Sequence, residues 1–215
     1  MLKRKFDCDN EENNKTNIEE LIESNSYKIY DSYNSQINSD KIVLYDNHIH
    51  FNAIISEETI QILIRYINTV IGNMHLFTVK NVYIHISSKG GYFRHILDFL
   101  QYKNTCNCEL ISIIENECVD SGFILAALCD YRIINKNAKC LLTKIDSENS
   151  YFWSYFCQCI NSVEQITQFK NMLYHVLTEV IDSKLTHHKL DAYLNEGCNW
   201  CSKKYKKLGL ADEIV

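Results

Sequence analysis

The stretch VYIHISSKGGYFRHILDFLQY, residues 82–102, changes its pattern halfway along. Its first part, VYIHI, has the apolar and β-branched character of a buried strand. Gly90 and Gly91 follow, and glycines let backbone N–H groups face a ligand without a Cβ in the way. Two such N–H groups can form an oxyanion hole, although a tight strand-to-helix turn would need the same glycines. Beyond them, apolar residues recur at helical spacing and predict a helix: Phe93, Ile96, Leu97 and Leu100.

The alternation of strand and helix extends on both sides of this stretch. Residues 57–71 carry an amphipathic helical pattern, with Ser56 as a candidate N-cap. FILAALC, residues 123–129, is apolar all round and predicts a fully buried helix. Strands that alternate with helices favour parallel pairing through right-handed crossovers, so we expect an α/β fold. Further strands are expected at 42–46, 48–54, 110–114, 132–134 and 140–142.

The C-terminal third has a different pattern. Apolar residues at helical spacing predict one long amphipathic helix at about 160–184. A helix of some 24 residues would reach roughly 36 Å, so we expect it to project from the core or to cap it. Ser202 can cap a last short helix, which Gly209 would end.

The first 40 residues differ in composition from the rest of the 215-residue chain. They hold five Lys or Arg and nine Asp or Glu, and they are rich in Asn and Ser with little periodicity. Such a segment cannot bury enough apolar surface to fold alone. We therefore expect a flexible acidic arm at 1–40 and one folded domain at 41–215.

Composition and charge exclude several classes of protein. The formal net charge of −5 lacks the basic footprint of a nucleic-acid binder. The start MLKRKFDCDN has no apolar segment typical of a signal peptide, and FILAALC is far too short to span a bilayer. We therefore expect a cytoplasmic protein without a nucleic-acid or membrane partner.

The ten cysteines and eight histidines raise the question of a metal site. Cys198 and Cys201 form the only C-x-x-C pair, and no second pair lies nearby, so free thiols are favoured over a structural zinc site. His85 and His95 flank the Gly-Gly loop, and His187 and His188 lie in a later connection. We expect each to be an ordinary surface or core histidine, and we expect no metal and no cofactor.

Three stretches, taken in order, resemble the proteolytic subunits of the Clp protease. Residues 82–102 resemble the family's strand and N-S-P-G-G loop, although Lys89 replaces the proline. Residues 118–142, CVDSGFILAALCDYRIINKNAKCLL, are similar to its A-A-S-M-G-A segment and the strand that follows. WCSKKYKKLGLADEIV, residues 200–215, resembles its ending. The resemblance implies a spiral of β-β-α units with a handle helix, as in the wider superfamily that includes the crotonase-like acyl-CoA enzymes.

The family is a family of serine endopeptidases, and its catalytic residues can be carried over position by position. Gly122 matches the glycine of S-M-G, so the nucleophile position holds Asp120. The histidine position holds Thr143, and the aspartate position holds Cys198. A triad needs a hydroxyl nucleophile, a base and a group that orients the base, and none of these residues supplies its part. The resemblance also assigns the oxyanion-hole amides to Gly90, Gly91 and Ser121.

Three hypotheses follow from a scaffold without its triad. The first is a non-catalytic homologue with a structural or regulatory role in a proteolytic ring, either a homo-oligomer or a mixed ring, with an AAA+ ATPase as a further partner. The second is an active serine endopeptidase that uses Ser121 with a different base. The third is a crotonase-like enzyme that binds acyl-CoA, with Asp120 as the acid or base beside the oxyanion hole.

Overall fold

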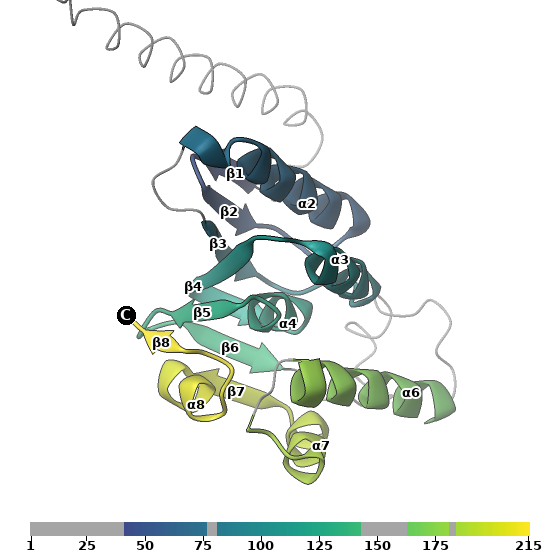
Figure 1. The fold of residues 1–215 in the computed structure, drawn as a ribbon. Coiled ribbons are helices and arrows are strands. Elements are labelled where there is room, and N and C mark those ends of the chain that lie inside the picture. Colours follow the sequence, from purple (N-terminus) through teal and green to yellow (C-terminus); the bar gives the residue numbers. More distant parts are fainter. Residues whose placement is uncertain (1–40, 77–80, 143–162, 181–183) are drawn as a thin grey trace, which may run out of the picture. The chain divides into compact units, whose positions relative to one another are not determined.

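The computed structural model describes residues 41–76, 81–142, 163–180 and 184–215 (Figure 1). These residues form a mixed α/β unit built on an eight-stranded sheet, which confirms the expected α/β fold. The expected arm at 1–40 lies outside the described residues. No helix in the described part of the chain is long and apolar enough to cross a membrane.

The sheet is parallel except at two ends. β1 and β2 form an antiparallel hairpin, and β7 runs antiparallel to β6. The main path runs β1-β2-β3-β4-β5-β8, and β6 branches from β4. The strands are β1 Lys41–Tyr45, β2 His48–Asn52, β3 Asn81–Ser88, β4 Glu109–Val119, β5 Tyr131–Ile134, β6 Lys139–Leu142, β7 Cys198–Cys201 and β8 Glu213–Ile214.

β4 divides its pairing between two neighbours, which makes the sheet branch. Its first half pairs with β5 through Ile111–Ile114, and its last residues, 117–119, pair with β6. The register to β3 shifts between these halves, because Ile86 faces Ile114 while Ser88 faces Cys118. Such a bulge bends the strand and re-aims the side chains beside it.

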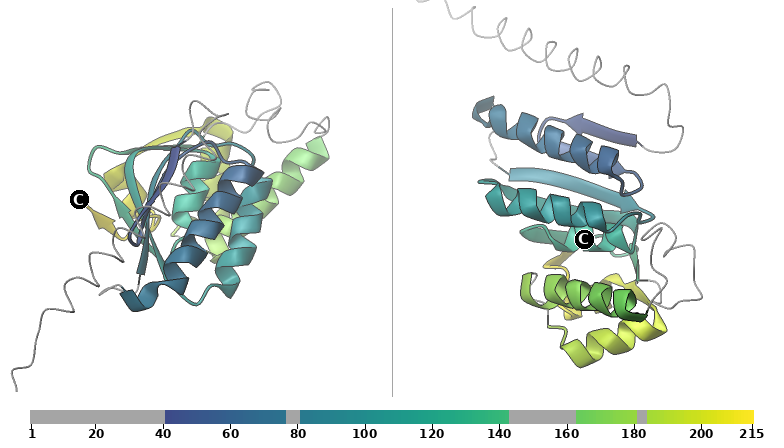
Figure 2. Two further views of the ribbon diagram at one scale, coloured as in Figure 1. Left: turned by 90° about the horizontal axis from the view of Figure 1, so that it is seen from above. Right: turned by 90° about the vertical axis from the view of Figure 1, so that its right-hand side faces the viewer.

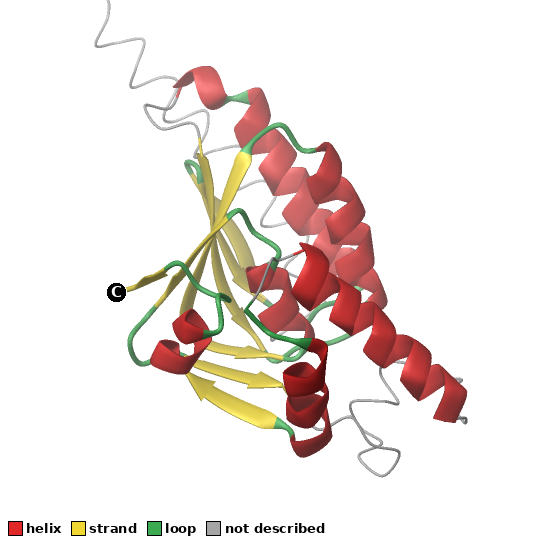
Figure 3. Ribbon diagram, turned by 60° about the horizontal axis from the view of Figure 1, so that its bottom comes forward, coloured by secondary structure: helices red, strands yellow, loops and turns green. Residues whose placement is uncertain are grey.

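The helices at 57–72, 94–105 and 121–127 lie together on one face of the sheet (Figures 2 and 3). Along β3 the residues Val82, Ile84 and Ile86 are fully buried, while Tyr83 and His85 between them stay partly exposed. This period of two is typical of a strand with one face against the core. The α-helices are α2 Glu57–Gly72, α3 Arg94–Thr105, α4 Ser121–Ala127, α6 Val163–Tyr174, α7 His187–Glu196 and α8 Ser202–Lys207, and the short helices are η1 Met74–Leu76 and η2 His175–Val180.

The ends of several helices follow local sequence signals. Ser56 caps α2 as predicted, and it forms a capping box with Thr59. The prediction for Ser202 was wrong: Cys201 takes the N-cap position of α8, and the Ser202 hydroxyl donates to the Lys136 carbonyl oxygen instead. Gly209, at φ 78°, follows the end of α8.

The long C-terminal helix is described only in part. α6 continues directly into the π-helical segment η2, so the described helix covers 163–180 of the expected 160–184. Leu173, Val176 and Leu177 on this segment are buried. Its C-terminal half therefore packs on the domain that carries it.

Candidate functional site

A strained turn joins β4 to α4. Asp120 lies between the strand and the helix with φ 49° and ψ −111°. Among the described residues other than glycine, only Asp46 also has a positive φ. Strain of this kind persists where the surrounding structure imposes it, and hydrolases place a nucleophile on such a strand-to-helix turn. Asp120 is 4% exposed, and its side chain makes no capping hydrogen bond to α4.

Asp120 occupies the N-cap position of α4 without the side-chain hydrogen bond that a residue there usually makes to the helix. The reason is the backbone conformation at Asp120, since an N-cap residue normally has extended angles that aim its side chain at the first turn. The backbone of Asp120 still takes part in the helix, because Ile124 N–H donates to the Asp120 carbonyl oxygen at 3.1 Å.

The glycine loop directly follows β3. Gly90 and Gly91 have φ values of 87° and 142°, which an L-residue rarely adopts. Ile55 N–H donates to the Gly90 carbonyl oxygen at 2.7 Å, and this holds the loop against the chain entering α2. Gly90 N–H donates to the Ser88 hydroxyl at 3.2 Å. The amide of Gly90, expected in an oxyanion hole, is therefore already bonded inside the protein.

The glycine loop and the strained turn lie against each other. A Cβ on Gly90 would lie 2.9 Å from the Val119 carbonyl oxygen and 3.2 Å from the Asp120 Cβ. The Ser121 hydroxyl donates to the Gly91 carbonyl oxygen at 2.8 Å. The structure thus brings together four of the residues singled out in the sequence: Gly90, Gly91, Asp120 and Ser121.

Cys198, which the resemblance places at the aspartate position, lies on a strand beside the one that meets this turn. Asp120 N–H donates to the Leu141 carbonyl oxygen at 2.8 Å, which ties the turn to β6. Cys198 is the first residue of β7 and pairs with Leu142, the last residue of β6. Thr143 itself lies outside the described residues.

The hydroxyl of Ser121 lacks the surroundings of an activated nucleophile. Ser121 is 2% exposed, and its hydroxyl proton is directed to a backbone carbonyl. No described histidine forms a hydrogen bond with this hydroxyl. Of the histidines considered as bases, His85 bonds Glu115 and His48, and His95 bonds Asp98. Without a base, a serine hydroxyl is a weak nucleophile near neutral pH.

A second cluster lies on the partly exposed face of the sheet, where the sequence predicted no site. His50, His85 and Glu115 place potential ligand atoms within 4.8 Å of one another. His48 joins them through a 2.9 Å hydrogen bond between its Nδ1 and the Nε2 of His85. Partial burial lowers the pKa of His48 and of His50, and the neighbouring His85 ring lowers both further. These two rings are therefore biased toward the neutral form.

The described cysteines include three buried thiols of the core. Cys118, Cys129 and Cys140 are free and buried. Burial raises the pKa of Cys129 and of Cys140 to about 12, and it raises the pKa of Cys118 as well. These thiols behave as small apolar side chains rather than as ligands.

Comparisons with known proteins show a similarity in fold but none in sequence family. No family model matches the chain, and no curated protein matches it. Among solved structures, the crystal structure of a peptidase from Plasmodium falciparum superposes with a TM-score of 0.60 at 13% sequence identity, covering 79% of this chain and 95% of that one. In all, 738 chains match in structure, so the fold is a common one and carries no activity by itself.

Proposed function

We propose that this chain is a non-catalytic relative of the Clp protease proteolytic subunits, with a structural or regulatory role in a proteolytic ring. The observation that carries the proposal is the strand-to-helix turn at Asp120. Its strained backbone is of the kind that presents a nucleophile in hydrolases, yet the residue on it is a buried carboxylate. A carboxylate at this place offers no hydroxyl and would repel a developing oxyanion.

The glycine loop supports loss of catalysis independently. An oxyanion hole needs free N–H groups aimed at the developing charge. The amide of Gly90 donates to Ser88, whose own hydroxyl donates to the Ala53 carbonyl oxygen at 2.7 Å. The loop therefore retains its shape through internal hydrogen bonds, and one of the three amides expected in the hole is engaged within the loop.

The same observations disfavour the two enzymatic alternatives. A peptidase that uses Ser121 would have to break the bond from its hydroxyl to Gly91 and recruit a base. A crotonase-like enzyme would need two free amides for the thioester carbonyl, and one of the three expected amides, that of Gly90, is already engaged. The fold of the Plasmodium falciparum peptidase is compatible with all three hypotheses, so the preference for the first rests on the residues of the site.

The proposal includes a specific form of the α/β fold and an assembly into rings. The branched sheet with helices on one face would form the spiral of β-β-α units, and α6 with η2 would form the handle. In the family that this sequence resembles, the handle makes contacts between stacked rings. We propose that the chain forms such rings alone or with active subunits, and that an AAA+ ATPase docks on them.

Assembly has a direct test in solution. We expect the full chain to sediment as a multimer, either alone or after mixing with active ring subunits from the same source. Exposed apolar side chains such as Tyr45 and Ile54, 62% and 42% exposed, are available for such contacts. A single species of the chain mass, 25.2 kDa, both alone and in the mixture would contradict the ring proposal.

A further inference from the structure

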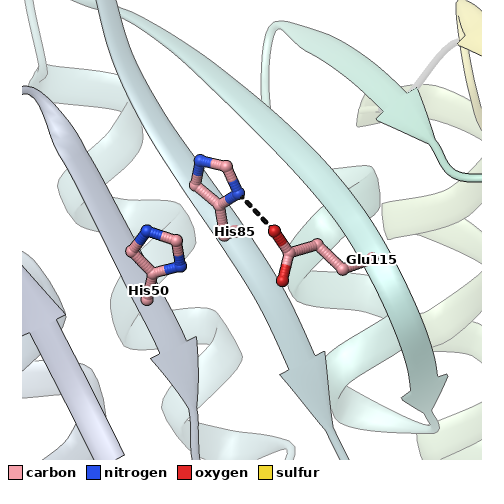
Figure 4. Close-up of side chains that lie close together, drawn as sticks. All are labelled: His50, His85 and Glu115. Atoms are coloured by element: carbon pink, nitrogen blue, oxygen red, sulfur yellow. Dashed lines mark hydrogen bonds and ion pairs between the residues drawn. The ribbon is translucent and has the colours of Figure 1, made fainter. Parts of the chain in front are cut away.

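Three side chains with nitrogen or oxygen ligand atoms converge on the partly exposed face of the sheet (Figure 4). His50 on β2 and His85 on β3 are direct partners in the parallel register. Their rings stack with centroids 4.3 Å apart and an angle of 17° between the planes. Both rings belong to the alternate set of residues that points away from the helices, because Ile49, Phe51, Ile84 and Ile86 fill the other face.

The bulge in β4 lies at the third member of the cluster. The register between β3 and β4 shifts between Ile86 and Ser88, directly where Glu115 follows Ile114. From there the Glu115 carboxylate reaches His85, with 2.8 Å between its Oε1 and the Nδ1 of His85. An irregularity that re-aims a side chain toward a cluster is a recurrent feature of functional sites.

We propose that His50, His85 and Glu115 bind one divalent transition-metal ion of the zinc type. Two imidazoles and one carboxylate are a ligand set typical of zinc sites that keep a fourth position open. Bonds of about 2.0–2.1 Å to a tetrahedral ion place its ligand atoms roughly 3.3 Å apart, and the ligand atoms here already lie within 4.8 Å. Side-chain rotations close the difference without moving the strands. Magnesium and calcium prefer oxygen ligands and are not expected to bind.

His48 acts as a positioning residue for His85. A metal-binding histidine usually directs its second ring nitrogen to a hydrogen-bond partner, which fixes its tautomer and orientation. When the Nδ1 of His85 binds the ion, its Nε2 carries the proton and donates to the Nδ1 of His48 at 2.9 Å. His48 is itself held by stacking on Tyr83, with ring centroids 4.6 Å apart.

The cluster is accessible to an ion from solvent. The side chain of His85 is 15% exposed and that of Glu115 is 41% exposed. The carboxylate can therefore leave its hydrogen bond with His85 and bind the ion, while the open position faces water. This site does not depend on the proposed loss of peptidase activity, because it lies on different strands and uses different side chains.

The test uses the full chain without a histidine tag, freed of metal with a chelator. Titration with Co²⁺ should give visible d–d absorption that saturates at one ion per chain, without the ultraviolet charge-transfer band of thiolate ligands. Zn²⁺ should displace Co²⁺, and Mg²⁺ should not. The variants H50A and E115Q should weaken Zn²⁺ binding by more than about 100-fold, and H48A by about 10- to 100-fold, as outer-shell partners do.

The matched control is H188A, which removes an exposed histidine of α7 and should leave Zn²⁺ affinity unchanged. Circular dichroism of every variant verifies that the fold is intact. Absence of saturable Co²⁺ absorption, a thiolate charge-transfer band, or equal Zn²⁺ affinity in H50A, E115Q and H188A would each overturn the proposal.

Discussion

Gly91→Ala should strongly destabilise the folded domain. A Cβ on Gly91 would lie 2.2 Å from the carbonyl oxygen of Ile55 and 2.7 Å from its amide nitrogen. Both are backbone atoms, and the φ of 142° adds strain for any L-residue. We expect a loss of roughly 3–5 kcal/mol, which is a large part of the roughly 5–15 kcal/mol that stabilises a typical domain. The shift in the midpoint of urea unfolding measures this loss of stability.

Gly72→Ala is the matched control for this substitution. Gly72 is the last residue of α2, and a Cβ there would meet nothing within 4 Å. Alanine favours a helix over glycine by about 0.5–1 kcal/mol, so this variant should be neutral or slightly more stable. If both variants unfolded at the same urea concentration, Gly91 would not be in the close approach described.

Phe123→Ala should have the second large effect. Phe123 is fully buried on α4, and its ring centroid lies 5.4 Å from that of Trp200 and 5.1 Å from that of Tyr205. Removing a buried aromatic ring leaves a cavity and costs roughly 3–5 kcal/mol. For a chain of this size, the melting temperature should fall by about 10 °C.

Tyr45→Ala tests whether the burial of Phe123 causes the loss of stability in Phe123→Ala. Tyr45 is an aromatic residue of β1 with 62% of its surface exposed. Its removal should change the stability by less than about 1 kcal/mol. Equal losses of melting temperature in the two variants would refute the packing of the C-terminal segment against α4.

Local patterns in the sequence were sufficient to predict an α/β fold. The helix at 57–71, with its Ser56 cap, could be predicted because its apolar periodicity and its cap depend only on neighbouring residues. The buried helix expected at 123–129 is present, but it begins and ends two residues earlier, at 121–127. The branching of β4 could not, since a strand that changes partners at a bulge leaves no local signal. The Ser202 cap was mispredicted for a related reason: a distant carbonyl, that of Lys136, accepts its hydroxyl proton.

The histidine cluster depends on strand register, which the sequence leaves open. HIHF at 48–51 and YIH at 83–85 both alternate histidine or tyrosine with apolar residues, and this was the available signal of a polar sheet face. A slip of one residue between β2 and β3 would put His50 on the opposite face from His85. Only the pairing of these two residues in the structure, with Glu115 at the bulge, makes a site.

The catalytic positions were located through family resemblance rather than through physical pattern. The structure supplies what the resemblance lacked: the strained angles of Asp120, the internal bond of the Gly90 amide and the partner of the Ser121 hydroxyl. None of these is visible in a sequence, because the Ser121 partner lies 30 residues away and the other two depend on how the loop and the turn fold.

Labelling with a fluorophosphonate, which reacts with activated serine hydroxyls, tests the loss of catalysis most directly. The full chain and the variants Asp120→Ser and Ser121→Ala would be compared beside an active serine hydrolase. We expect no labelling of the unmodified chain, because loss of a catalytic triad costs roughly a millionfold in rate. Asp120→Ser alone should stay unlabelled, since the family resemblance places Thr143 and Cys198, and no histidine or aspartate, at the positions of the base and its orienting group. Labelling that disappears in Ser121→Ala, or that arises in Asp120→Ser, would contradict the account.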